Sequence, residues 1–156
     1  MSAALQLTQP RFDNIFQGME EILDLSMIKM KLMDHEEGPG WTSEYCDRVE
    51  TEYRRYLALS RRYPEKAVVP SKIVDAFWHF HILDTQAYAP DCARTFGYFL
   101  HHFPYFGMRS DEDALALGAA YDETLNLYEL HFGAPPEDLW ARSGASRCPS
   151  CGNRCR

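Results

Sequence analysis

The stretch that decides the fold runs from Pro70 to Gly107 and reads PSKIVDAFWHFHILDTQAYAPDCARTFGYFLHHFPYFG. Among its closely spaced aromatic residues lie four of the chain's six histidines: His79, His81, His101 and His102. Histidine is costly to bury, because its ring nitrogens need hydrogen-bond partners or a metal ion. This stretch therefore predicts either a polar network inside a helical core or a metal site.

The apolar spacing of the chain predicts an all-α, single-domain bundle of about five helices with a short, cysteine-containing C-terminal tail. Gaps of three and four residues between apolar positions are typical of amphipathic helices, and we find no segment with the clean alternation of a strand. The expected helices span residues 12–34, 43–63, 71–88, 91–101 and 110–132. We expect Ala89-Pro90 to separate the third from the fourth, because a residue before proline disfavours the helical conformation.

Capping residues support these boundaries. Ser43, Ser71 and Ser110 each stand where a helix is expected to begin, and a serine hydroxyl can accept a hydrogen bond from an otherwise unpaired N–H of the first turn. Gly133 is the expected C-terminal stop of the last helix.

The chain divides by composition into a mobile leader (residues 1–10), a helical domain (11–141) and a basic, cysteine-rich tail (142–156). The whole chain of 156 residues has a net charge of −7, whereas the tail contains arginines and no acidic residue. Such an acidic body argues against nucleic-acid binding there. No apolar run approaches the roughly 20 residues that a membrane helix requires, so no membrane association is expected.

Cysteine usage predicts a reducing compartment. The chain has five cysteines, an odd number, and Cys46 and Cys92 lie inside expected helices. A disulfide framework is therefore not expected. The N-terminus lacks a charged region followed by a long apolar stretch, which argues against a secretory signal. We expect an intracellular, cytoplasmic protein.

Helical geometry separates the first two histidines of the stretch. His79 and His81 are two residues apart, so they point roughly 200° away from each other on a regular helix and cannot bind one ion together. Asp75 lies four residues before His79, on the same face, where its carboxylate can orient the imidazole. His81 similarly lies three residues before Asp84.

Several kinds of chemistry remain open for these residues: a structural hydrogen-bond network, a zinc or other transition-metal site, or acid–base catalysis without a metal. Zinc or iron is the cofactor that this composition favours. Cys92 could form a thiolate pair with a histidine. No phosphate-binding loop or dinucleotide fingerprint is present, so no nucleotide cofactor is expected. The body candidates for metal ligation are His79, His81, His101, His102 and Cys92, with Asp75, Asp84 and Tyr88 as the residues that position them.

The tail is a second candidate site. Cys148, Cys151 and Cys155 include the Cys-Pro-x-Cys-Gly pattern of a zinc-ribbon knuckle, whose turn directs two sulfurs at one ion. Three cysteines fall short of the four ligands of a structural zinc site, so a fourth ligand must come from elsewhere. An unstructured, redox-sensitive tail and an iron–sulfur site remain alternatives.

The segments WTSEYCDRVETEYRRYL, VPSKIVDAFWHFHILDT, YAPDC and FGYFLHHFPYFG resemble the glycine-rich domain protein-like family over residues 41–107. The resemblance rests on an aspartate before a Trp-His-x-His core, a following tyrosine and Asp-Cys pair, and a later histidine. These positions are Asp75, Trp78, His79, His81, Tyr88, Asp91, Cys92 and His102. With only nine glycines, this chain corresponds to the family's core module without a glycine-rich region. The resemblance implies that these residues act together, and it supplies no substrate.

Two hypotheses follow. The first is a small metal-binding helical protein, either a binding protein or a metalloenzyme. The second is a non-catalytic interaction module with structural histidines, which binds a protein partner through the tail or through the aromatic loop 103–108. Whether the protein is an enzyme is left open at this point.

Overall fold

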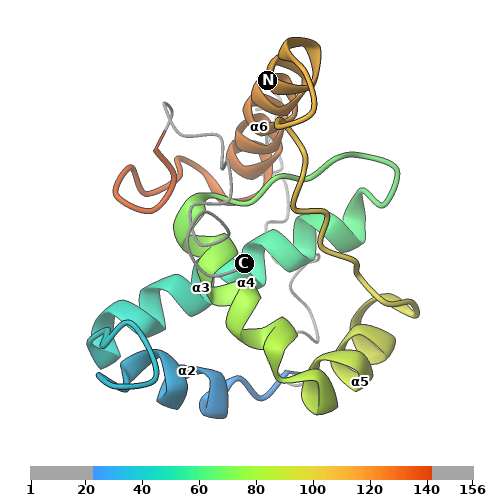
Figure 1. Ribbon diagram of the computed structural model, residues 1–156. Helices are drawn as coiled ribbons and strands as arrows, with labels where there is room; N and C mark the ends of the chain where they lie inside the picture. The colour runs from blue at the N-terminus through green and yellow to red at the C-terminus, as the bar shows by residue number, and fades with distance from the viewer. Residues whose placement is uncertain (1–22, 142–156) are drawn as a thin grey trace, which may run out of the picture.

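The computed structural model describes residues 23–141, and this part of the chain contains helices and no strand (Figure 1). The helices are α2 (Ser26–Met33), α3 (Ser43–Arg62), α4 (Lys72–Leu83), α5 (Thr85–Phe96) and α6 (Asp111–Phe132). The predicted all-α, single-domain fold with about five helices is thus confirmed. The predicted leader (residues 1–10) and tail (142–156) lie outside the described residues, and the domain boundaries remain a prediction.

Side-chain caps fix where three helices begin. Ser71 and Ser110 each accept a hydrogen bond from the backbone N–H three residues further on, at 3.3 and 3.1 Å, as predicted. For α3 the cap is Thr42, and Ser43 is the first helical residue. Gly133 follows the last residue of α6, which confirms the predicted stop.

The predicted break at Ala89-Pro90 is wrong. The chain turns at Asp84, whose side chain accepts a hydrogen bond from Ala87 N at 3.3 Å and so begins α5. Pro90 lies inside α5 on its exposed side, where the carbonyl left without a partner is accessible to water. The helix continues through Pro90 because its other side is packed against the core. The buried residues on that side recur at helical spacing: Tyr88, Asp91, Cys92 and Thr95.

The fourth helix also ends earlier than predicted. Gly97 adopts a left-handed conformation with φ 78°, which favours glycine and terminates α5 after Phe96. Residues 97–110 therefore form a non-helical segment, and His101 and His102 belong to that segment instead of to a helix.

The helix predicted over residues 12–34 is not continuous, and its part before residue 23 lies outside the described residues. Residues 23–25 are not helical. Leu23 and Leu25 are both buried, and residues two apart point the same way only in an extended backbone. Asp24 accepts a hydrogen bond from Ser26 N at 3.0 Å, which competes with a continuous helix and favours a start at Ser26.

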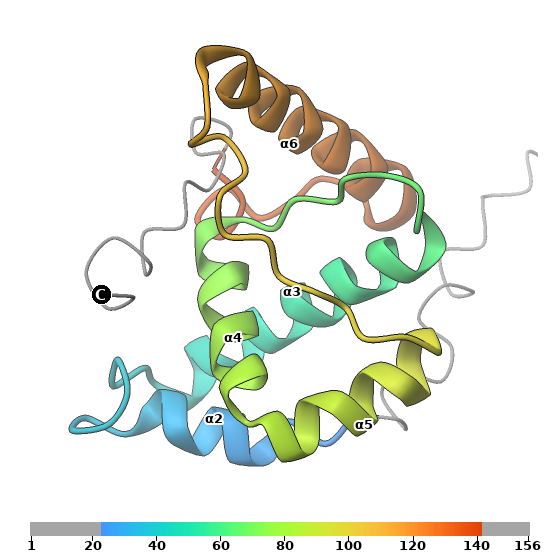
Figure 2. The same cartoon turned by 45° about the vertical axis from the view of Figure 1, so that its right-hand side comes forward.

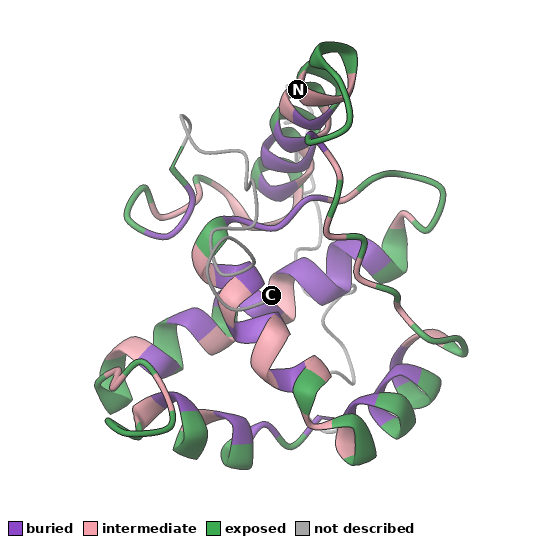
Figure 3. Ribbon diagram, viewed as in Figure 1, coloured by how far each residue is buried: buried purple, intermediate pink, exposed green. Residues whose placement is uncertain are grey.

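Helices α2 to α5 pack together, and α6 lies across one end of this group (Figure 2). The segments 63–71 and 97–110 run between α6 and the other helices. The buried face of α4 meets that of α3, where Val49, Tyr53, Val74 and Phe77 are fully buried (Figure 3). Burial of such side chains is the main stabilising contribution to the fold.

A buried glutamate attaches the end of the described chain to α3. Glu52 accepts hydrogen bonds from Tyr128 Oη at 2.6 Å and from Trp140 Nε1 at 2.8 Å. Arg55, one turn further along α3, pairs with the other carboxylate oxygen at 3.0 Å. The paired charge and both donors compensate the desolvation of Glu52. Across residues 23–141, none of the helices combines the length and the apolar character needed to cross a membrane.

Candidate metal site

Three side chains from two separate segments form a compact group. Asp75 and His79 lie one turn apart on α4, and His102 approaches from the segment 97–110. His102 Nε2 lies 2.9 Å from His79 Nε2 and 2.9 Å from Asp75 Oδ1. His79 Nε2 lies 3.6 Å from Asp75 Oδ2. The three side chains therefore direct potential ligand atoms at one point, and we call them the three-ligand group.

These spacings suit coordination to a single ion. Nitrogen and oxygen ligands lie about 2.0–2.2 Å from zinc, so two ligands of one ion are separated by roughly 3 to 3.5 Å. The three measured contacts are close to this range. No protein ligand beyond these three joins the group within residues 23–141, so an ion held here would keep further coordination positions for water or another molecule.

The hydrogen bonding of the group is incomplete without an ion. Asp75 is 2% exposed, and its Oδ2 has no hydrogen-bond partner among the described residues. A buried carboxylate oxygen without a donor is strongly unfavourable. The ion pairs of Asp75 in this part of the chain are with His79 and His102, and no lysine or arginine takes part in them. A bound cation would supply the missing positive charge.

The protonation state of His79 also suits metal binding. Burial lowers the pKa of His79, and the neighbouring His102 lowers it further, whereas Asp75 acts in the opposite direction. The lowered pKa keeps the imidazole neutral at pH 7, and a neutral imidazole has the free electron pair that a metal ion requires.

Tyr88 on α5 holds His102 near α4. Its hydroxyl accepts a hydrogen bond from Trp78 Nε1 at 2.9 Å and donates one to the carbonyl of Leu100 at 2.5 Å. The rings of Trp78 and His102 also pack together, with centroids 4.7 Å apart. Further along, Asp113 accepts a hydrogen bond from Gly107 N at 2.7 Å. The segment that carries His102 is thus fixed at both ends.

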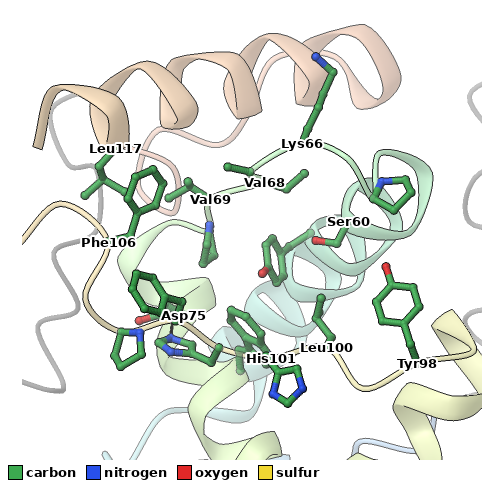
Figure 4. Close-up of a pocket in the computed structure, with 18 residues that line it drawn as sticks. Ser60, Lys66, Val68, Val69, Asp75, Tyr98, Leu100, His101, Phe106 and Leu117 are labelled. Carbon is green, nitrogen blue, oxygen red and sulfur yellow. Dashed lines mark hydrogen bonds and ion pairs between the residues drawn. The ribbon is translucent and has the colours of Figure 1, made fainter. Parts of the chain in front are cut away.

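A cavity of about 320 Å³ lies beside the three-ligand group (Figure 4). Asp75, Trp78 and His102 form part of its wall. The rest of the wall comes from the end of α3, the segment 64–70 and the segment 98–106, with Leu117 of α6. A metal ion bound to the group would therefore be accessible from this cavity.

His81 lies in a different environment from His79. It is 2% exposed, and both of its ring nitrogens are hydrogen-bonded: Nδ1 to Tyr53 Oη and Nε2 to Asp91 Oδ2, each at 2.9 Å. Asp91 in turn pairs with Arg94. This network occupies every polar atom of the imidazole ring, so His81 has no nitrogen left for an ion.

The remaining predicted residues lie apart from the three-ligand group. His101 is exposed, packs its ring at a tilt against Phe99 with centroids 4.8 Å apart, and directs its ring away from Asp75 (Figure 4). Cys92 is buried and free on α5, and Asp84 caps that helix. The tail cysteines Cys148, Cys151 and Cys155 lie outside the described residues.

Two features of the site carried no recognisable signal in the sequence. Tyr53 reaches His81 from a helix 28 residues earlier, and it looked like one apolar position among several on α3. The cavity depends on two non-helical segments, and residues 97–101 of one of them were predicted to be helical. The spacing of Asp75 and His79 did place both residues on one helix face.

The chain matches one protein family, described as UCP032817-like, over residues 21–118. This range includes the three-ligand group, the His81 network and most of the cavity wall. Neither the curated proteins nor the solved structures gave a match. The family description specifies no activity, substrate or cofactor, so the functional argument rests on the geometry of the site. Because the match covers well over half of its length, the chain belongs to the UCP032817-like family.

Proposed function

We propose that Asp75, His79 and His102 bind one divalent transition-metal ion, zinc or ferrous iron, and that the protein is a metalloenzyme. The observation that carries the proposal is the convergence of two imidazole nitrogens on a buried carboxylate, one oxygen of which has no hydrogen-bond partner within residues 23–141. In a purely structural network we would expect that oxygen to have a donor, as both His81 nitrogens have partners.

Two histidines and one carboxylate are a donor set with known chemical uses. Catalytic zinc sites combine three protein ligands with a bound water, and non-haem ferrous sites use two histidines and one carboxylate with open positions. Either metal would act as a Lewis acid toward a molecule in the adjacent cavity. The residues of this chain would hold the ion, keep the His79 imidazole neutral and shield one side of the site with Trp78.

Metal content measured on untagged protein tests this proposal. We expect one equivalent of zinc or iron in the full chain and in a chain truncated after residue 141. His79→Gln and His102→Gln should each abolish it. His101→Gln is the matched control, because His101 is the neighbouring histidine but lies outside the group, and it should retain the metal. Metal that is lost on truncation alone would assign binding to the tail, and metal-free full-length protein would overturn the proposal.

A second candidate function, a protein-interaction module, is favoured by the aromatic loop 103–108. Phe103, Tyr105 and Met108 are 55, 60 and 64% exposed, and exposed apolar side chains in one loop are typical of binding surfaces. A photo-crosslinker at position 105 should then capture one defined protein in cell extract, whereas a crosslinker at the even more exposed Leu115 on α6 should not. Capture from both positions, or from neither, would contradict this function.

The resemblance to the glycine-rich domain protein-like family and the cytoplasmic location remain proposals. For the location, the supporting observation is that Cys46 and Cys92 are free and buried, as is common in a reducing compartment. Neither contributes to the argument for the metal site.

A further inference from the structure

We infer that the cavity beside the three-ligand group binds a small aromatic molecule that carries no charged group beyond the oxygen atoms that point toward the metal. This inference rests on the proposed function, because the metal would hold the polar end of the molecule. It goes beyond that function by specifying the class of compound.

The position of the cavity supplies the first part of the argument. Asp75 and His102 contribute both to the three-ligand group and to the cavity wall. A molecule in the cavity would therefore lie next to the open coordination positions of the ion. The volume of about 320 Å³ is at the small end of the range for ligand pockets, which suits a single-ring compound better than a nucleotide or a peptide.

The chemistry of the wall supplies the second part. Much of it consists of flat, apolar rings: Tyr56, Trp78, Tyr98, Phe103 and Phe106, together with three prolines. Aromatic side chains favour stacked or edge-to-face contact with another ring. In Figure 4, Tyr98 lies far from Asp75 across the cavity lining, so a ring could lie between the metal end and the Tyr98 end.

The charges of the wall supply the third part. Asp75 belongs to the three-ligand group, and Lys66 at the rim is paired with Glu123 of α6. Apart from the proposed metal ion, the wall has no unpaired lysine or arginine that could bind an anionic substituent, and the chain carries a net charge of −7. Ser60 and the hydroxyl of Tyr56 are hydrogen-bonded to each other on the wall, where they can accommodate one polar substituent.

Two probes that share one metal-binding group but differ in the substituent attached to it test the inference. Benzohydroxamic acid carries an aromatic ring, whereas acetohydroxamic acid carries a methyl group in its place. Each would be titrated into cobalt-loaded protein, with the visible absorption of cobalt as the readout. We expect the aromatic probe to bind at least about tenfold more tightly, because its ring is buried against the wall. Equal affinity for the two probes would overturn the inference.

Substitutions in the cavity wall test whether the aromatic probe binds in this cavity. Val68→Trp should fill part of the cavity and remove the preference for the aromatic probe. Tyr98→Ala should weaken the preference for the aromatic probe several-fold. Tyr98 is exposed enough that the fold should tolerate the change. Leu115→Trp is the matched control, because Leu115 is 76% exposed on α6 and is not part of the wall. A preference that survives both wall variants would place the probe elsewhere and overturn the inference.

Cobalt content measured on the same samples separates the two proposals. Protein that binds no cobalt would overturn the metal site and this inference together. Protein that binds one equivalent of cobalt but does not distinguish the probes would overturn the inference alone and leave the metal site supported.

Discussion

Two histidines on one helix, two residues apart, have opposite environments. His81 is enclosed between Tyr53 and Asp91, with a partner for each ring nitrogen. His79 Nε2 meets a second imidazole at 2.9 Å and lies 3.6 Å from Asp75 Oδ2, an oxygen that has no hydrogen-bond partner in the described chain. The first arrangement is complete as a hydrogen-bond network. The second becomes complete when a cation is added, and this difference is the basis for assigning a structural role to His81 and a metal-binding role to His79.

The comparison shows that burial alone does not distinguish the two roles. Both histidines have a pKa that burial lowers, and both contact an aspartate. What distinguishes them is the balance of donors and acceptors. In the His81 network, Tyr53 can donate to Nδ1 while Nε2–H donates to Asp91, so each proton has one acceptor. In the three-ligand group, Asp75 Oδ2 is a buried acceptor with no donor among the described residues.

The largest effect is expected from His81→Ala. This change leaves Tyr53 and Asp91 buried without their partner and also creates a cavity. We expect a loss of about 3 kcal/mol in the free energy of unfolding, measured by urea denaturation of the metal-free protein. The matched variant His79→Ala should lose less than about 1 kcal/mol under the same conditions, because His79 is partly exposed and its partners are incompletely satisfied already.

Equal losses for the two variants would remove the distinction between the sites. A larger loss for His79→Ala would reverse it.

The next largest effect is expected from Asp75→Asn. The amide keeps the shape of the side chain but removes the negative charge, so the affinity for zinc should fall about a hundredfold, which corresponds to about 2.7 kcal/mol. The metal-free protein should keep its stability, because an amide N–H can donate to a histidine nitrogen in place of the carboxylate oxygen that has no partner within residues 23–141. Isothermal titration with zinc and urea denaturation measure the two quantities. Strong destabilisation with unchanged zinc affinity would make Asp75 a structural residue.

Tyr88 connects the two regions, since its ring packs against His81 and its hydroxyl holds Leu100. Tyr88→Phe removes the acceptor for Trp78 Nε1 and the donor for the Leu100 carbonyl. We expect a loss of about 1–2 kcal/mol in stability and a roughly tenfold weaker affinity for zinc, because the segment carrying His102 is less well positioned. Thr95→Val, on the same buried face of α5, is the control for stability. An unchanged affinity for zinc in Tyr88→Phe would show that His102 is positioned by other contacts.

The sequence predicted the helices more reliably than the site. Apolar spacing and the hydroxyl caps at Ser71 and Ser110 are local features, and the structure follows them. The boundary at Pro90 was misjudged because a proline on an exposed helix face leaves a carbonyl that water can satisfy. The preference of the residue before proline was overcome by the packing of the buried face of α5.

The candidate site was only partly accessible from the sequence. The spacing of Asp75 and His79 placed both on one face of α4 and directed His81 elsewhere. The meeting of His102 with this face depends on the early end of α5 at Gly97 and on the hydrogen bond from Tyr88 to Leu100. Both are consequences of tertiary packing, which the helical period does not encode.

The smallest expected effect is the pH dependence of the metal-free protein. Burial lowers the pKa of both His79 and His81 below the 6.5 of an ordinary histidine, and His131 on α6 is shifted in the same direction. The unfolded chain therefore binds protons more readily than the folded chain does. Stability is complete above pH 6.5 and declines as the pH falls through 6.5 toward the folded-state pKa values. Urea denaturation at pH 7.5 and 5.5 should show this decline in the wild type and a smaller decline in His79→Gln. If the decline is the same in both, His79 takes up its proton equally well in the folded and unfolded states, and the contrast with His81 then rests on hydrogen bonding alone.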